Sequence, residues 1–186
     1  MTGIMREIET RRAKRALDTK PIGEDAVGRI MEASTLAPSC FNNQPWRFVL
    51  VHGTDHLEKI HGFLPGANYW VKKAPLLICV VVKKEDDCVL SDGRDYAFFD
   101  AGLAVMNLVL QATSEGLIAH PIAGYKPVEI KAALGIPSEY TLLTLVALGY
   151  PGDEGHLNEK HLELEHSTRD RKPMEEVVFK NGWKKG

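Results

Sequence analysis

The sequence predicts an α+β fold in a single domain that spans residues 1–186. Segments with helical spacing are mixed with apolar, β-branched segments, and the regular strand–helix alternation of a doubly wound sheet is absent. The longest predicted helix, over 96–117, is apolar on nearly every side, which is typical of a helix buried on most of its faces. In so small a domain few elements can cover such a helix, and a partner chain is one way to cover it.

Two helices are expected in the N-terminal part of the chain. The first covers 3–17, with Ile4 and Ile8 on one side and charged residues elsewhere. The second covers 24–36 and is stopped by Pro38. The segment that follows, APSCFNNQP, is rich in Asn, Ser and Pro and is therefore predicted to be a loop.

Strands and short helices are expected in the rest of the chain. Apolar segments predict strands over 47–51, 76–82 and 140–148, of which LLICVVV (76–82) suits a buried strand. Short helices are expected over 55–63, with Thr54 as N-cap, and over 128–134. From residue 152 the chain becomes polar, so 152–186 is predicted to be an arm on the surface or around another element.

Composition excludes several classes of protein. The 23 Lys and Arg residues against 25 Asp and Glu leave a net charge of −2, which does not favour nucleic acid or anionic lipid as a partner. No apolar run reaches the ~20 residues that span a bilayer, and the N-terminus lacks the apolar core of a secretion signal. The three cysteines form no CxxC pair, so we expect no disulfide framework and a cytoplasmic, reducing location.

Two groups of arginines could bind an anion. On the predicted first helix, Arg11 and Arg15 would share a face beside Arg12, and their guanidinium forks would fit phosphate oxygens. In an extended tail, Arg169 and Arg171 would point to the same side. The alternative in both cases is a solvated charged surface, and charge pattern alone leaves that alternative open.

Two further segments could contact a ligand, and two kinds of site are not supported. The amides of the loop at 37–45 could bind a heterocycle, or the segment could be an ordinary helix-to-strand loop. Pro121–Gly124 could expose backbone N–H groups or simply end a strand. The histidines lack metal-site spacing, so no metal is expected, and GxGxxG, GxxxxGK[ST] and GxSxG motifs are absent.

Six segments in order carry a resemblance to a known family. They are RRAKRALD, APSCFNNQPWRFVLV, DAGLAVMNLVLQATSEGL, HPIAGY, ALGYP and RDRKPMEEVV, and together they cover about residues 6–178. In this order they resemble the nitroreductase-like family of FMN-dependent oxidoreductases. The resemblance implies a mostly antiparallel central sheet flanked by helices, with a long buried central helix. It also implies a homodimer with FMN at the subunit interface, and an arm that packs on the partner subunit.

The resemblance also assigns residues to the cofactor. Arg11, Arg12 and Arg15 would contact the phosphate and ribityl chain, Ala13 would contribute backbone only, and Arg169 and Arg171 would close over the phosphate. The flavin would be contacted by Pro38, Ser39, Cys40, Asn42, Gln44, Pro121, Ile122, Ala123 and Gly124. Cys40 replaces the more usual Ser or Ala, which places a thiol near the cofactor. No protein side chain is expected to be catalytic, because the cofactor carries the redox chemistry.

The implied activity is transfer of two electrons from NADH or NADPH to a flat acceptor, such as a nitroaromatic or a quinone, by a ping-pong mechanism. Alternatives are a flavin-binding protein without turnover, or a same-fold reductive dehalogenase or flavin-degrading enzyme. Only residues 83–94 separate the 76–82 strand from the long helix, so the lid of larger family members is missing. Phe41, Tyr69 and Trp70 are the aromatic residues predicted to contact substrate.

Overall fold

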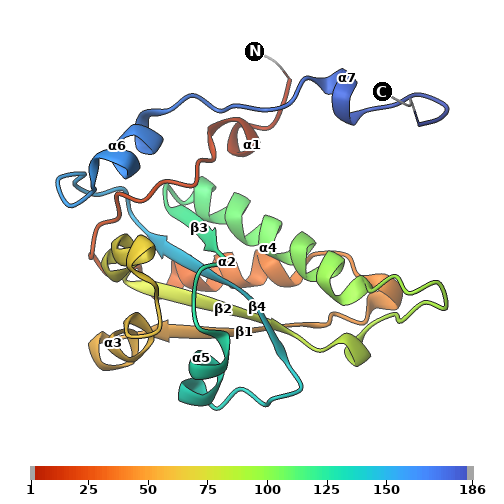
Figure 1. Cartoon of the computed structure of the whole chain (residues 1–186), viewed down its shortest axis with the longest axis horizontal. Helices are drawn as coiled ribbons and strands as arrows, with labels where there is room; N and C mark the ends of the chain where they lie inside the picture. Colours follow the sequence, from red (N-terminus) through yellow and green to blue (C-terminus); the bar gives the residue numbers. More distant parts are fainter. Residues whose placement is uncertain (1–2, 184–186) are drawn as a thin grey trace.

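The computed structural model describes residues 3–183, in which helices cover both faces of one sheet (Figure 1). The strand order is β1-β2-β4-β3, and every neighbouring pair is antiparallel, which confirms the predicted α+β class and sheet type. The strands are β1 (Trp46–His52), β2 (Leu76–Val82), β3 (Ile118–Ile122) and β4 (Thr141–Gly149). The helices are α1 (Arg6–Thr10), α2 (Glu24–Thr35), α3 (Thr54–His61), α4 (Tyr96–Ser114), α5 (Pro127–Leu134), α6 (Glu159–His166) and α7 (Met174–Val177).

The core forms on both faces of the central strand β2, all of whose residues are buried. Because side chains alternate along a strand, Leu77 and Cys79 point toward the layer of α3 and α5. Ile78 and Val80 point the other way and pack with residues of α2 and α4. A strand covered on both faces needs the continuous apolar sequence that predicted it.

The helix α4 is shorter than predicted and is not buried on most sides in the single chain. It ends at Ser114 because Gly116 (φ 74°) turns the chain, and Leu117 N–H then donates to the Ala112 carbonyl (2.8 Å). Among residues 3–183, α4 alone is long and apolar enough to cross a membrane by length and composition. Here it packs against the sheet and α2, but Phe99 is 60% exposed on its outer face.

Most other predicted elements lie within a few residues of their expected bounds. Thr54 is the first residue of α3 rather than its N-cap, which is Gly53, and no side chain caps this helix. The arm contains α6, whose N-terminus is capped by the side chain of Asn158 through the N–H of His161 (2.9 Å).

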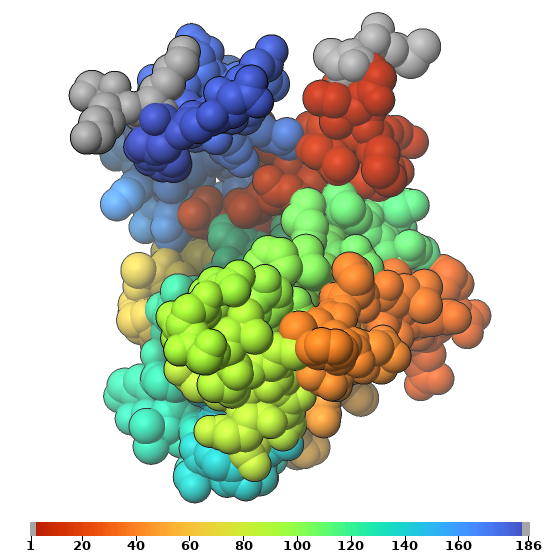
Figure 2. Space-filling model, turned by 90° about the vertical axis from the view of Figure 1, so that its right-hand side faces the viewer, coloured from red at the N-terminus to blue at the C-terminus, as the bar shows by residue number. Residues whose placement is uncertain are grey.

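The two ends of the chain lie together at one end of the molecule. Figure 2 shows the N-terminal segment (red) and the C-terminal arm (blue) on the same side of α4 (green). Backbone hydrogen bonds join Asp18 N–H to the Tyr150 carbonyl (2.9 Å) and Gly152 N–H to the Ala16 carbonyl (2.9 Å). A Cβ atom on Gly152 would lie 2.5 Å from the nitrogen of Asp18, so this close approach requires glycine.

Candidate functional site

The N-terminal arginines lie in an extended segment, so the predicted helix over 3–17 is wrong beyond Thr10, where α1 ends. A helix would place Arg11 and Arg15 one turn apart, and like charges at that spacing destabilise a helix by roughly 0.2–0.5 kcal/mol. In its extended conformation, the backbone of this segment instead forms hydrogen bonds with the buried carboxylate of Glu165. That carboxylate accepts hydrogen bonds from Arg15 N–H (2.9 Å) and from the N–H of the next residue (3.3 Å).

Arg169 joins the C-terminal arm to the end of α1. Its guanidinium donates hydrogen bonds to the carbonyl oxygens of Ile8 (3.0 Å), Glu9 (2.8 Å) and Arg11 (2.6 Å). Carbonyls at a helix C-terminus have no partner within the helix, and a cation there also matches the helix dipole. Arg12 adds a second link by donating to the carbonyl of Ser167. The two arginine segments therefore hold one another in place, while Arg171 donates to the carbonyl of the neighbouring Asp170.

The five predicted arginines make a positively charged cluster, and we call Arg11, Arg12, Arg15, Arg169 and Arg171 the arginine cluster. Burial lowers the pKa of Arg11, and the charges of Arg169, Arg171 and Arg12 lower it further. No ion pair among residues 3–183 neutralises any member of the cluster. Because guanidinium groups match phosphate oxygens in charge and shape, the arrangement favours a bound anion with several oxygens.

A buried histidine lies next to the arginine cluster. His120 on β3 donates from Nδ1 to the Lys14 carbonyl (2.9 Å) and packs against Trp70, with ring centroids 4.5 Å apart. Burial lowers the pKa of His120 to about 4, and the nearby charges of Arg15 and Arg11 contribute to the shift. His120 was not predicted as a site residue, although a single polar residue in an otherwise apolar strand could have marked it.

The backbone at the end of β3 is exposed. Pro121 and Ile122 end the strand, and Ala123 and Gly124 follow it with little side-chain cover. The carbonyl of Gly124 accepts a hydrogen bond from Asn68 Nδ2 (2.6 Å). A Cβ atom on Gly124 would lie 2.9 Å from that nitrogen, so glycine allows this approach. The side chain of Ile122 belongs to the core.

The loop at 38–44 has a backbone conformation that is rare for its residues. Phe41, Asn42 and Gln44 have φ values of 48°, 59° and 52°, and each such residue costs about 1–3 kcal/mol. Ser39 Oγ stabilises the turn by accepting from Gln44 N–H (2.9 Å). Residues in this conformation cluster at binding sites, where the surrounding structure enforces it. Asn42 and Gln44, with the preceding Pro38, are exposed.

A disulfide joins Cys40 to Cys88, which corrects the expectation that this chain holds none. The two Cα atoms lie 6.2 Å apart, within the usual range for a disulfide. Their separation of 48 residues forms no motif, which is why the sequence did not reveal the pair. Cys79 in β2 stays a free, buried thiol.

The loop and the arginine cluster lie at opposite ends of α4 within one chain (Figure 1). Cys40 N–H donates to Asp100 Oδ2 (2.6 Å) near the start of α4, whereas His120 follows shortly after its end. From Asp100 to Ser114, where α4 ends, a helical rise covers about 21 Å. The structure therefore links β3 to the segment of the arginine cluster through His120 and the Lys14 carbonyl, and it keeps the loop at 38–44 apart from the cluster.

The three aromatic residues predicted to contact substrate have different surroundings. Phe41 is 90% exposed, whereas Trp70 is 1% exposed and belongs to the core of this chain. The Tyr69 hydroxyl accepts from Asn158 N–H (2.7 Å), and its ring stacks on that of His161. Among the three, Phe41 alone is an exposed residue.

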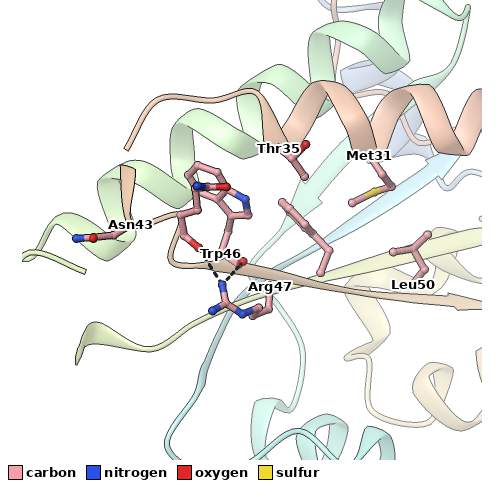
Figure 3. A pocket seen from close by; sticks show the side chains of 8 residues that line it. Met31, Thr35, Asn43, Trp46, Arg47 and Leu50 are labelled. Carbon is pink, nitrogen blue, oxygen red and sulfur yellow. Dashed lines mark hydrogen bonds between the residues drawn. The ribbon is translucent and has the colours of Figure 1, made fainter. Parts of the chain in front are cut away.

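A hollow of about 630 Å³ adjoins the loop at 38–44, between α2 and β1 (Figure 3). Arg47 lies at its rim and donates to the carbonyls of Gln44 (2.8 Å) and Trp46 (2.9 Å), so it fixes the end of the loop. Trp46, the first residue of β1, is buried. The lining residues are Met31, Thr35, Asn43, Gln44, Trp46, Arg47, Phe48 and Leu50.

Fold and site together define an α+β protein with an arginine cluster built from both ends of the chain and a polar loop at the far end of a long helix. Comparison with protein families gives the same class. The chain belongs to the Nitroreductase family, whose model matches residues 8–65 and 62–150.

Similar proteins agree with this family. A putative NADH dehydrogenase/NAD(P)H nitroreductase of Methanothermobacter thermautotrophicus is 31% identical over 156 residues, covering 81% of this chain and 78% of its own. A protein of the same description from Archaeoglobus fulgidus is 29% identical over 159 residues, covering 83% and 88%. A solved structure described as an oxidoreductase containing FMN has a TM-score of 0.86 at 28% identity, covering 97% of this chain and 93% of its own.

Proposed function

We propose that this protein is an FMN-dependent oxidoreductase that takes two electrons from NAD(P)H and passes them to a flat acceptor such as a nitroaromatic or a quinone. The observation that carries the proposal is the arginine cluster, whose five guanidinium groups have no carboxylate partner among residues 3–183. The phosphate of FMN brings about two negative charges at neutral pH, which suits such a cluster. The descriptions of the similar proteins support this choice of cofactor and donor.

The residues fit FMN in two groups. The arginine cluster would hold the phosphate, while the exposed backbone of Ala123 and Gly124 would approach the flavin edge. Ser39, Asn42 and Gln44 would offer hydroxyl and amide groups to the ring system from the loop at 38–44. When bound, FMN supplies the two-electron chemistry, and the protein orients it and limits access to it.

Because the two groups lie at opposite ends of α4, one complete site requires two chains. We therefore propose a homodimer, with the arginine cluster of one subunit facing the loop of the other. The exposed apolar face of α4, including Phe99 and Met106, would provide the contact. The arm would pack on the partner subunit, because its apolar residues are exposed in the single chain. These exposed residues are Met174, Val177, Val178 and Trp183.

Donor and acceptor are both flat molecules, so we expect them to use one binding place in turn and to give ping-pong kinetics. The exposed ring of Phe41 is the proposed stacking surface for either. We place the protein in the cytoplasm, where NAD(P)H is available.

Flavin binding tests the assignment of the arginine cluster. The double variant Arg11→Ala/Arg171→Ala loses two donors of charge-assisted hydrogen bonds, each worth about 1.5–3 kcal/mol, so FMN should bind about 100-fold more weakly or worse. The measurement is equilibrium titration of apoprotein with FMN, followed by flavin fluorescence. The matched control is Arg94→Ala, which removes an exposed arginine paired with Asp92 and should leave affinity unchanged.

Anaerobic addition of NADH or NADPH tests the activity. Loss of the yellow colour with either donor, and its return on adding a quinone, is the expected result. In the flavin titration, unchanged FMN affinity in the variant Arg11→Ala/Arg171→Ala would show that the phosphate lies elsewhere. Colour that persists with both donors would show that this flavoprotein does not use NAD(P)H.

A further inference from the structure

The disulfide between Cys40 and Cys88 links the cofactor loop to the segment before α4. Cys40 begins a single 3-10 turn at 40–42, and Cys88 follows a second one at 84–86. Both cysteines are partly exposed, whereas Cys79 is buried and burial raises the pKa of its thiol to about 12. A reagent in solution can therefore reach the disulfide but not the third thiol.

Two buried carboxyl groups lie against this disulfide. Asp100 is 2% exposed and accepts from Cys40 N–H at 2.6 Å, while Asp87 is 8% exposed and accepts from Cys88 N–H at 2.8 Å. The second oxygen of Asp87 is buried and meets no hydrogen-bond donor among the described residues. A carboxylate oxygen of Asp87 and the two sulfur atoms all lie within 4.8 Å of one another.

The surroundings of Asp100 favour the protonated form of its carboxyl group. Burial raises the pKa of Asp100, and the side-chain contact with Asp87 and its charge raise it further, against the hydrogen bond from Cys40. A purely structural cross-link has no need of such a pair, since burying acids costs several kcal/mol where apolar side chains would pack freely. The placement suits a site where a proton must be delivered to sulfur.

We propose that Cys40–Cys88 is a reversible thiol–disulfide exchange site, which a dithiol reduces and the Asp87–Asp100 pair supplies with a proton. Cys88 is the leaving sulfur, because Asn43 Nδ2 lies 3.6 Å from its Sγ and stabilises the thiolate by hydrogen bonding. A better leaving group speeds exchange at the sulfur bonded to it, so attack occurs at Cys40.

The exchange balances in two steps. A thiolate of the dithiol forms a bond to Cys40 Sγ, the disulfide breaks, and its electron pair goes to Cys88 Sγ, which takes the proton of the carboxyl pair. The second thiol of the reductant then loses its proton and attacks its own sulfur in the mixed disulfide, which releases Cys40 as a thiolate that is protonated from water. The carboxyl pair regains its proton from water. The reductant leaves as a disulfide, and two electrons and two protons have moved to the protein.

Reduction would release the loop at 38–44 from the segment before α4. That loop holds the proposed flavin contacts Ser39, Asn42 and Gln44, so the thiol state would control FMN affinity. This consequence rests on the proposed function, whereas the exchange chemistry does not. Disulfides in reducing compartments are usually transient, catalytic or redox-sensing, which agrees with a reversible pair.

Native thiol counting tests the exchange. The full-length protein is incubated with dithiothreitol, alkylated without denaturant, and mapped by mass spectrometry. We expect alkyl groups on Cys40 and Cys88 only, with Cys79 protected as an internal control of folding, and re-formation of the disulfide in oxidised glutathione. Reaction of Cys40 and Cys88 only after denaturation, or thiols that never re-oxidise, would overturn the proposal. Stoichiometric zinc on the reduced pair would also overturn it, since the two cysteines would then be metal ligands.

Variants separate the roles of the residues. After exposure to the dithiol's oxidised form, the variant Cys88→Ser should retain a stable mixed disulfide on Cys40. The variant Cys40→Ser should form about tenfold less mixed disulfide on Cys88. Asp87→Asn keeps an acceptor for Cys88 N–H but removes the charge that helps to raise the pKa of Asp100, so native reduction should slow about tenfold or more while its end point is unchanged. An unchanged rate in Asp87→Asn would remove the carboxyl pair from the proposal.

A final measurement keeps this inference separate from the proposed function. FMN titrations of the oxidised and reduced protein should give affinities that differ about threefold or more, and the Cys40→Ser/Cys88→Ser double variant should match the reduced protein. Equal FMN affinities would show that the thiol state does not act on FMN binding through the loop at 38–44. Absence of FMN binding in all forms would refute the proposed function, while the thiol counts would still decide the exchange.

Discussion

His120 is a neutral imidazole buried beside positive charges, and this makes stability depend on pH. The pKa of His120 is lowered from 6.5 to about 4, and burial is the largest cause of this shift. Between pH 4 and pH 6.5 this imidazole therefore binds a proton in the unfolded chain but not in the folded chain. His120 accordingly stabilises the folded state above pH 6.5, and this stabilisation is lost as the pH falls toward 4. The contribution is about 3 kcal/mol.

The variant His120→Gln, which has no group that titrates here and retains a donor for the Lys14 carbonyl, should lack this dependence. Urea unfolding of the apoprotein at pH 7 and pH 4 is the measurement, because titration of other groups cancels when the two proteins are compared. The wild-type protein should lose about 3 kcal/mol more than the variant. Equal losses, or an NMR-determined His120 pKa near 6.5, would show that the imidazole is solvated.

At the scale of elements, two glycines in similar open space should respond oppositely to alanine. Gly116 follows α4 with φ 74°, and Gly28 lies within α2; a Cβ atom on either would meet nothing within 4 Å. Gly116→Ala should lower the free energy of unfolding by about 1–2 kcal/mol, because an L-residue is strained there. Gly28→Ala should raise it by about 0.5–1 kcal/mol, because alanine favours the helix. Thermal unfolding of both variants checks the signs, and a stabilised Gly116→Ala would contradict the turn that ends α4.

Elements were predictable where neighbouring residues decide the conformation. The strand over 76–82 and the helix over 24–36 follow from local apolar patterns and lie where expected, within one residue. The helix over 3–17 fails because its alternative depends on Glu165 and Arg169, which are about 150 residues away in the chain. Local spacing holds no information on such partners.

The same limit applies to the candidate site. The arginines were selectable from charge and from a family resemblance, but their convergence at the chain ends requires the fold. Asp87 and Asp100 were missed because a buried acid looks like any other acid in sequence. Cys40 was assigned to the cofactor, and its bond to Cys88 was not foreseen because no motif spacing joins them.

For the whole molecule, the apolar face of α4 predicts that two chains form the working unit. Phe99 and Met106 are 60% and 40% exposed, and Leu103 and Leu110 complete a stripe at helical spacing. An apolar stripe of this kind marks an interaction site on a soluble protein. The same contact would bring an arginine cluster to the loop that its own chain keeps apart.

The variant Met106→Glu should therefore weaken both dimerisation and FMN binding. A carboxylate buried in an apolar interface costs several kcal/mol, so dimerisation should weaken about 100-fold or more. Size-exclusion chromatography with light scattering measures the mass, and flavin absorbance measures occupancy in the same peak. Val128→Glu, which adds the same charge at a 71% exposed apolar residue on α5, is the control and should remain a yellow dimer. A Met106→Glu monomer that keeps its FMN would show that one chain completes the site, and an unaffected dimer would place the interface away from α4.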